Sequence, residues 1–390
     1  MRNYVTIVAV AGMVWACASG VSAVDMALVS VGNPGNTGEL SGAGAGGYGP
    51  DRVCGAVDYT YSIGKYEVTA GQYTEFLNAV AATDTYGLYN ELMWSDLYGY
   101  GCKIERSGSS GNYTYSVASD WANRPVNYVN WGDAARFANW MHNGQPTGTQ
   151  GLATTEDGSY FLNGAMAAAE LILVTREPDA TWLIPSEDEW YKAAYHKNDG
   201  ATGNYFEYPT SNDSTPSHDL IDPDPGNNAN VIAPEYAIGS PYYRTEVGEF
   251  ENSVSPYGTF DQGGNVYEWT EAVLFDSKHL ARGGSFNYDG CELEAPYRYH
   301  ENVVYGYGSV GFRLAKLPSL AEKADFDGDG DVDGGDFMTF ALCFNGSLRP
   351  PRPTCESFYT DFDGDSDVDG RDHMTFSTCF NGSLRPPKCN

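Results

Sequence analysis

One acidic segment near the C-terminus occurs twice and restricts the possible folds of this region more than any other feature. Asp-Phe-Asp-Gly-Asp-Gly-Asp-Val-Asp begins at Asp325, and Asp-Phe-Asp-Gly-Asp-Ser-Asp-Val-Asp begins at Asp361. Carboxylates at alternate positions repel one another unless a cation binds between them, and this spacing matches a twelve-residue calcium loop. An acidic disordered tail is the alternative, but two copies in register, each followed by an apolar helix start, argue against it.

Each repeat therefore predicts one calcium loop. Gly330 occupies position 6 of the first loop, where the chain turns sharply, whereas Ser366 takes that position in the second. Serine reaches the left-handed conformation at a cost, so we expect the second loop to bind calcium more weakly. The expected ligands are Asp325, Asp327, Asp329, Asp331, Asp333 and Asp336 in residues 325–336, and Asp361, Asp363, Asp365, Asp367, Asp369 and Asp372 in residues 361–372. At position 7, which is Asp331 or Asp367, the backbone carbonyl would bind.

The N-terminus has the composition of an export signal. Arg2 precedes an apolar run over residues 5–18, and the small residues Ser22 and Ala23 offer a cleavage site. We expect a signal peptide over residues 1–23 and a mature protein that is secreted, periplasmic or on the cell surface. Cys17 leaves a lipoprotein open as the alternative, although Trp15 fits a lipidation sequence poorly.

Charge excludes two classes of partner. The formal net charge is −30, so nucleic acids and anionic membranes would repel the chain. No stretch after the signal is apolar and long enough to span a bilayer, so we expect no membrane-spanning segment. The acidic excess favours cations as partners, and it also favours solubility.

The chain divides into a body and a tail. We expect a loose segment over residues 24–52, a body over 53–317, a linker over 318–324 and a tail over 325–390. Hydrophobic periodicity and capping residues predict three helices in the body, after Thr69, from about Asn130 and after Ser186. The remaining strands are short and the connections long, which a bound ion could order.

The tail resembles dockerin modules, in which paired calcium loops, each followed by one helix, dock onto a cohesin domain. The resemblance covers residues 325–390 and implies a protein partner, cohesin or another. Each helix here is followed by Cys-Phe-Asn-Gly-Ser-Leu-Arg-Pro-Pro, which is not a dockerin ending. With that departure in mind, we expect disulfides Cys343–Cys355 and Cys379–Cys389, which leaves Cys54, Cys102 and Cys291 unassigned.

The body is similar to the formylglycine-generating enzyme, or sulfatase-modifying factor, family. The motifs that carry the resemblance are Ile-Gly-Lys-Tyr-Glu-Val-Thr (63–69), Arg-Pro-Val-Asn (124–127), Leu-Ile-Pro-Ser-Glu-Asp-Glu-Trp-Tyr-Lys-Ala-Ala (183–194), Gly-Gly-Asn-Val-Tyr-Glu-Trp (263–269), Arg-Gly-Gly-Ser (282–285) and Gly-Phe-Arg (311–313). The resemblance implies an α+β, irregular, C-type lectin-like fold with low regular secondary structure, followed here by a small α-helical tail domain.

The same resemblance implies structural calcium in the body. Carried over by motif, one site would use Asp261, Gly264, Val266 and Glu268, with the middle two binding through carbonyls. Asn230 and Val231 match part of a second site, whose other ligands the sequence does not identify. The alternative is that Asn265 and Glu268 only hydrogen-bond the turn.

The family's copper chemistry lacks its ligands in this chain. Active members hold copper(I) between two cysteines after Arg-Gly-Gly-Ser, and those positions are Tyr288 and Leu293 here. Copper is therefore not expected as a cofactor, and Cys291 lies out of phase. A related branch uses iron bound by three histidines, and the six histidines of this chain are scattered.

Two functions follow from different classes. The first is a secreted, non-catalytic module that binds a peptide or glycan through a groove near Ser285 and Tyr288 and is tethered by its tail. The alternative is a formylglycine-generating oxidase with an altered site, acting on a sulfatase cysteine. Loss of the thiol pair and the presence of an attachment tail favour the first function, because a shared fold does not fix chemistry.

Overall fold

The computed structural model describes residues 23–390 except 96, 98, 276, 277, 350–354, 356–359, 363–366, 384, 386, 388 and 390. The predicted signal peptide lies outside these residues except for Ala23. Within them, no helix is both long and apolar enough to cross a membrane. The overall class is mixed α and β, irregular and poor in regular secondary structure, as expected.

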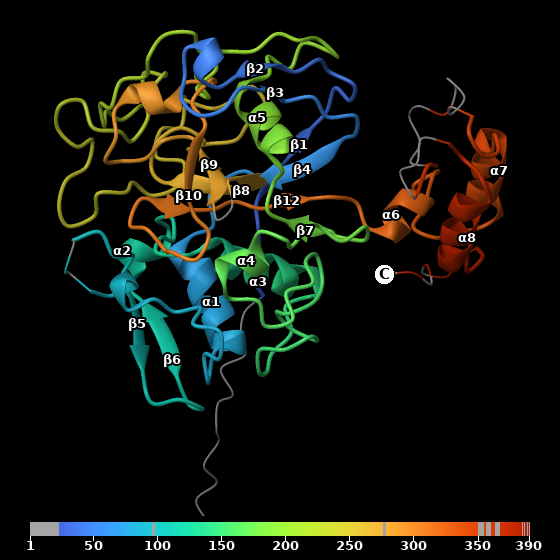
Figure 1. Ribbon diagram of the computed structural model, residues 1–390, viewed down its shortest axis with the longest axis horizontal. Helices are drawn as coiled ribbons and strands as arrows, with labels where there is room; N and C mark the ends of the chain where they lie inside the picture. Colours follow the sequence, from blue (N-terminus) through green and yellow to red (C-terminus); the bar gives the residue numbers. More distant parts are fainter. Residues whose placement is uncertain are drawn as a thin grey trace, which may run out of the picture.

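Two small four-stranded sheets form the centre of the body (Figure 1). The first has the order β1-β4-β12-β7, and the second has the order β10-β9-β8-β11. Their strands are β1 (Leu28–Val31), β4 (Tyr61–Gly64), β12 (Ala315–Lys316), β7 (Trp182–Leu183), β10 (Tyr299–Asn302), β9 (Lys278–Arg282), β8 (Tyr267–Leu274) and β11 (Val310–Gly311). Two separate hairpin-like pairs are β2 (Glu39–Ser41) with β3 (Arg52–Cys54), and β5 (Ile104–Ser107) with β6 (Thr114–Val117).

The three predicted body helices are present as α1 (Ala70–Val80), α3 (Trp131–His142) and α5 (Glu187–Tyr195). Each begins with a reciprocal capping box, formed by Thr69, Asn130 and Ser186 at the respective N-caps. A cap satisfies backbone N–H groups that have no partner inside the helix. The short helices α2 (Ser119–Ala122) and α4 (Ala168–Leu171), and the 3₁₀ turns η1 (Ala43–Ala45), η2 (Glu91–Met93) and η3 (Gly290–Leu293), complete the body.

The body core is aromatic and joins α1 to α3. Phe76 packs edge-on against Phe137 with ring centroids 5.2 Å apart, and Trp140 also lies 5.2 Å from Phe76. Tyr73 and Phe312 extend the same cluster. All five side chains are essentially buried, which is the main free-energy gain available to a fold with so little regular structure.

Two expected connections are ordered parts of the fold. Residues 24–52 are not a loose segment, because β1 pairs with β4 in register Leu28↔Gly64 and β2 pairs with β3. Backbone pairing, which the small residues of this stretch do not indicate, accounts for the difference. The expected linker over 318–324 contains helix α6 (Leu320–Ala324), whose Ser319 N-cap and Glu322 close a capping box.

The tail contains helices α7 (Gly334–Cys343) and α8 (Gly370–Cys379), which pack side by side (Figure 1). Phe340 and Phe376 stack between them at 5.1 Å, and Val332 and Val368 are fully buried in the same cluster. The disulfides Cys343–Cys355 and Cys379–Cys389 are both present, which confirms the expected pairing.

Candidate functional site

The first tail loop gathers five of its six aspartates into two carboxylate groups, and Asp329 belongs to neither group. Asp325, Asp327 and Asp336 each place a carboxylate oxygen within 4.8 Å of the others, and Asp331 and Asp333 do the same with Asp336. Asp336 is fully buried and accepts the N–H of Phe326 on one oxygen and that of Asp333 on the other. Backbone donors thus aim the buried carboxylate into the loop.

The shape of this loop depends on glycine. Gly330, at position 6, has φ +89°, a conformation that L side chains rarely adopt. Gly335 lies so close to the aspartates that a Cβ there would be 2.8 Å from Asp327 Oδ2. The carboxylate oxygens gathered beside Gly335 fit a hard cation such as Ca²⁺.

The second loop repeats this arrangement as far as it is described. Asp367, Asp369 and Asp372 form the corresponding carboxylate group, and Asp372 Oδ1 accepts the N–H of Phe362 at 2.6 Å. Asp361 is partly buried beside Phe362. Asp363, Asp365 and Ser366 lie outside the described residues, so the expected difference in affinity between the loops stays a prediction.

A second acidic cluster lies inside the body. Glu268, on β8, is fully buried and accepts two hydrogen bonds from Arg313 and one from Trp190 Nε1 at 2.6 Å. Glu67 is also buried, and neither of its carboxylate oxygens accepts a hydrogen bond from another residue. Glu67 interacts electrostatically with Asp261 and Glu268, and burial with this repulsion raises its pKa well above the ordinary value.

This body cluster carries more negative than positive charge. Glu67, Asp261 and Glu268 lie around Arg313, and Arg244 also interacts electrostatically with Glu67, so one negative charge is unbalanced when all three carboxylates are ionised. Burial raises the pKa of Asp261 to about 6. The three carboxylates of this cluster fit a divalent cation. Glu67 has the free oxygens to bind it, because the oxygens of Glu268 already accept hydrogen bonds. Glu67 was not identified from the sequence, although an acidic residue next to the core residue Val68 was a signal for it.

The residues of the two expected body calcium sites lie next to each other. Asn230 and Gly264 form a parallel bridge, and Asn265 donates its N–H to Asn230 O at 3.0 Å. Asn230 Nδ2 donates to Asn265 Oδ1, which leaves Asn230 Oδ1 buried without a partner. Val231 packs in a small buried cluster with Leu293, and Val266 is fully buried. Calcium binding by these residues stays a prediction.

Arg-Gly-Gly-Ser serves packing and a buried ion network. Arg282 and Arg298 both pair with Glu187, at 2.6 and 2.7 Å, and the two arginines hold the pKa of Glu187 down at about 2 although its burial opposes this. Gly283 has φ +96°, and a Cβ there would be 2.4 Å from Gln262 O. Ser285 is fully buried and donates to Asn287 Oδ1 at 2.8 Å.

The positions of the copper thiols are filled by an aromatic and an aliphatic side chain. Leu293 is fully buried, with its methyl groups close to Gly263 and Gly284. Tyr288 packs against Tyr267 and Tyr299, at 5.7 and 6.4 Å between ring centroids. Leu293 is thus enclosed and Tyr288 is half-buried, and neither side chain offers a thiol to a metal.

The free cysteines occupy three different environments. Cys54 is buried beside Arg282, and Cys102 is buried in the main core. Cys291 is exposed, and desolvation with the nearby Asp289 raises its pKa to about 11, which makes a thiolate rare at neutral pH.

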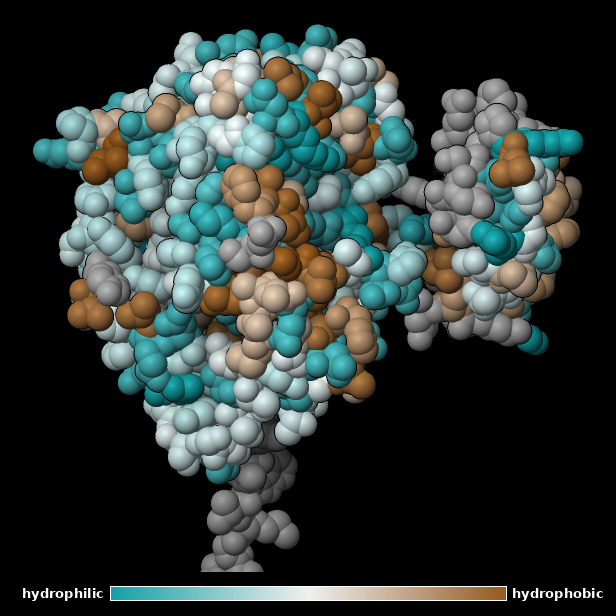
Figure 2. Space-filling view, in the orientation of Figure 1, coloured by the Kyte–Doolittle hydropathy of each residue, from teal (hydrophilic) through white to brown (hydrophobic). Residues whose placement is uncertain are grey.

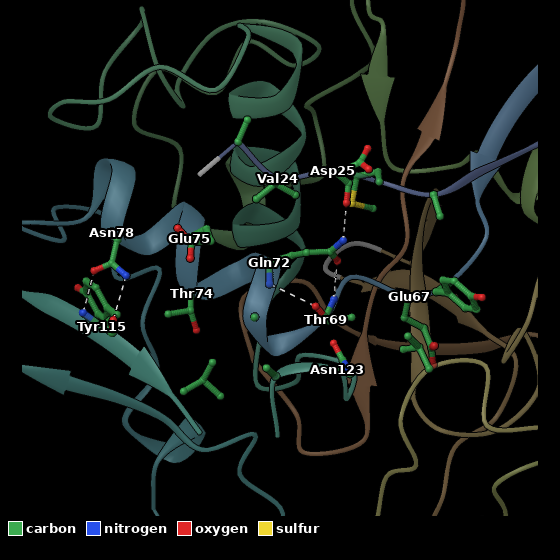
Figure 3. Close-up of a pocket in the computed structure, with 18 of the residues that line it drawn as sticks. Val24, Asp25, Glu67, Thr69, Gln72, Thr74, Glu75, Asn78, Tyr115 and Asn123 are labelled. Atoms are coloured by element: carbon green, nitrogen blue, oxygen red, sulfur yellow. Dashed lines mark hydrogen bonds between the residues drawn. The ribbon is translucent and has the colours of Figure 1, made fainter. Parts of the chain in front are cut away.

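A cavity of about 750 Å³ lies at the N-terminal end of α1 (Figure 3). Gln72 donates there to Asp25 O at 2.9 Å, and Glu67, Glu75 and Asn78 also line it. Two smaller cavities lie near His142 and near Arg298. Ser285 and Tyr288, the expected groove residues, line none of these three cavities.

Comparison with known proteins places the body in a family. The Sulfatase-modifying factor enzyme 1-like domain model matches residues 30–318. Similar solved structures are the Treponema denticola variable protein 1 (18% identity, TM-score 0.47, 76% of this chain and 97% of that one), CarF (19%, 0.41, 76% and 99%) and PvdO from Pseudomonas aeruginosa (16%, 0.40, 75% and 92%). No curated protein sequence matches. The chain belongs to the family of sulfatase-modifying factor enzyme 1-like domains.

Proposed function

We propose that this protein is an exported, calcium-binding module that uses the sulfatase-modifying factor fold for binding rather than catalysis. One observation carries the proposal: Leu293 and Tyr288, at the positions of the copper thiols, are packed into the body. Copper(I) in this family is held by a thiolate pair, and an isobutyl group with a phenol does not provide one. The remaining thiols, Cys54, Cys102 and Cys291, lie in separate surroundings.

An oxidation assay tests the loss of catalysis. The purified full chain is incubated with copper, oxygen and a peptide that contains Cys-x-Pro-x-Arg, and the aldehyde product is measured by mass spectrometry. We expect no conversion above that of copper alone. Turnover that depends on the protein would overturn the proposal and favour the oxidase, and turnover lost in a Cys291→Ser variant would identify the thiol responsible.

Calcium is the cation that we propose for both tail loops. Carboxylate oxygens gathered around glycine-dependent turns suit this hard ion. Calorimetric titration of the full chain should show at least two binding events that Asp325→Ala together with Asp361→Ala removes. Asp58→Ala, an exposed acid outside both loops, is the matched control. Unchanged heats of calcium binding in the double loop variant would refute the calcium assignment. Binding events that remain after the tail events are lost would be assigned to the body cluster.

The tail helices also expose apolar side chains. Helices α7 and α8 expose Met338, Leu342 and Met374 by about two thirds each. Figure 2 shows hydrophobic residues beside hydrophilic ones on this lobe. Exposed apolar side chains that form a contiguous patch mark protein-binding surfaces, and Met338 and Leu342, four residues apart, lie on one face of α7. We propose that a protein of the cohesin type, or another exported protein, binds here and tethers the body.

A panel of cohesin domains tests this attachment. Calcium-dependent binding of the full chain, lost with Met338→Glu plus Met374→Glu, is the expected result. Met166→Glu changes a similarly exposed methionine of the body and should leave binding intact. Binding that both variants retain would place the docking surface elsewhere.

A further inference from the structure

The two tail repeats exchange their Asn-Gly-Ser segments, which are residues 345–347 and 381–383. Asn345 and Gly346 follow the first helix, and both donate their N–H groups to Val368 O of the second loop, at 2.9 and 3.0 Å. Asn381 and Gly382 follow the second helix and donate to Val332 O of the first loop, at 3.0 and 3.2 Å. Each segment therefore binds the calcium loop of the other repeat.

The serine of each segment extends this exchange to an expected ligand. Ser383 donates its hydroxyl to Asp333 Oδ2, and Ser347 donates to Asp369 Oδ2. These aspartates occupy position 9 of the two loops. The other oxygen of Asp333 accepts the N–H of Gly335 at 2.7 Å, so this carboxylate is oriented from both sides.

Local structure brings each segment to the opposite loop. Gly346 and Gly382 have φ values of +84° and +82°, so the chain reverses directly after each helix. Asn345 and Asn381 each come two residues after a disulfide-bonded cysteine, Cys343 or Cys379, which fixes the start of the segment. The receiving valines are buried in the shared core.

We infer that each Asn-Gly-Ser segment positions a calcium ligand in the loop of the other repeat. Ser383 then supports calcium binding in the first loop, and Ser347 supports it in the second. This inference rests on the proposal that the loops bind calcium. Groups that orient a ligand from outside the coordination shell affect metal affinity, and their loss typically weakens it by about tenfold or more. Each repeat would then need its partner repeat for full affinity.

Variants with a single active loop test the crossed assignment. In a full chain with Asp361→Ala the first loop is the only tail loop that titrates by calorimetry, and we expect Ser383→Ala to weaken this event by about tenfold. Ser347→Ala in the same background should leave it unchanged. With Asp325→Ala the roles reverse, and Ser347→Ala becomes the damaging change. Ser383→Thr, which keeps the hydroxyl, should restore the first loop.

The outcomes separate the two ideas. Three results would overturn the inference that each serine supports the loop of the other repeat. They are equal effects of both serine variants on one loop, an effect of each serine on its own loop, and no effect at all. Absence of tail binding in the unmodified loops would instead refute the calcium proposal itself. Intact disulfides by mass spectrometry and an unchanged circular dichroism spectrum show that each variant has folded.

Discussion

Arg313 binds Glu268 through two parallel hydrogen bonds, Nε to Oε2 and Nη2 to Oε1 at 2.6 Å, with both side chains completely buried. Nη1 of the same arginine donates to Gly64 O on β4, so the pair connects the two central sheets. A planar guanidinium suits this bidentate geometry, which an ammonium cannot reproduce. The pair also sets the charge of the cluster that contains Glu67 and Asp261.

Removal of this arginine should destabilise the body strongly. Arg313→Leu leaves Glu268 buried with a single donor, Trp190, beside two further carboxylates. Breaking a buried pair from one side typically costs about 3–5 kcal/mol. Urea unfolding in the presence of a calcium chelator measures the loss without compensation by a bound cation.

An exposed ion pair provides the control for that measurement. Lys197 lies 3.5 Å from Asp213, and both side chains are substantially solvated. Lys197→Ala should change the free energy of unfolding by less than about 1 kcal/mol. A loss of similar size in the Arg313 and Lys197 variants would contradict the structural role given to Arg313.

Gly284 and Leu293 should be coupled energetically. A Cβ at Gly284 would be 2.6 Å from Leu293 Cδ1, at a φ of +68°. Gly284→Ala should cost roughly 2–4 kcal/mol from overpacking and backbone strain. Leu293→Ala removes the clash. In a double-mutant cycle, the destabilisations of the two single variants should therefore add up to at least about 1 kcal/mol more than the destabilisation measured for the double variant.

Gly283 supplies the matched comparison. Its Cβ would meet a backbone atom, Gln262 O, at 2.4 Å, and no side-chain truncation relieves that contact. Gly283→Ala and Leu293→Ala should therefore be additive in urea unfolding. Additivity in both cycles would mean that Leu293 does not fill the space beside Gly284.

Sequence and structure agree where the determining interactions are local. Thr69 with Gln72, and Ser186 with Glu189, lie three residues apart, so the capping boxes and the helix starts are readable directly. The grouping of the tail aspartates follows from their fixed spacing for the same reason. The disulfides join cysteines separated by 12 and 10 residues, so their pairing could also be predicted from the sequence.

Interactions between distant residues account for what the sequence did not reveal. Strand β1 was expected to be loose because its partner, β4, lies about thirty residues further on and no local pattern indicates the pairing. Glu67 was overlooked because its neighbours Asp261 and Glu268 are brought to it only by the fold. The exchange between Ser383 and Asp333 has the same origin, since the two residues are 50 positions apart.

Reduction should destabilise the tail and spare the body. Each of the two disulfides closes a short loop, with separations of 12 and 10 residues, which predicts about 2–3 kcal/mol per bond. Adding a reductant during scanning calorimetry in excess calcium should lower the temperature of the tail transition. In a variant with serine at Cys343, Cys355, Cys379 and Cys389 the reductant should have no further effect. A shift of the body transition instead would show that one of the remaining thiols forms a bond.

Acid should destabilise the body through His279. This residue, on β9, is buried and packs at a tilt against Trp131, with ring centroids 4.4 Å apart, and burial lowers its pKa from 6.5 to about 4. Between these two values the unfolded chain binds a proton that the folded chain does not, so stability is complete above pH 6.5 and falls as the pH decreases toward 4. The contribution of His279 to this fall is about 3 kcal/mol at pH 4.

The variant His279→Phe isolates this contribution, because phenylalanine keeps a ring against Trp131 and does not titrate. Urea unfolding of both proteins at pH 7 and at pH 4, with chelator present, gives the change in stability for each. The decrease on acidification should be smaller in the variant by about 3 kcal/mol. Glu187, whose folded pKa of about 2 also makes acid destabilising below pH 4.5, is present in both proteins and cancels in the difference. Equal decreases in the two proteins would show that the imidazole reaches solvent and is protonated in the folded state.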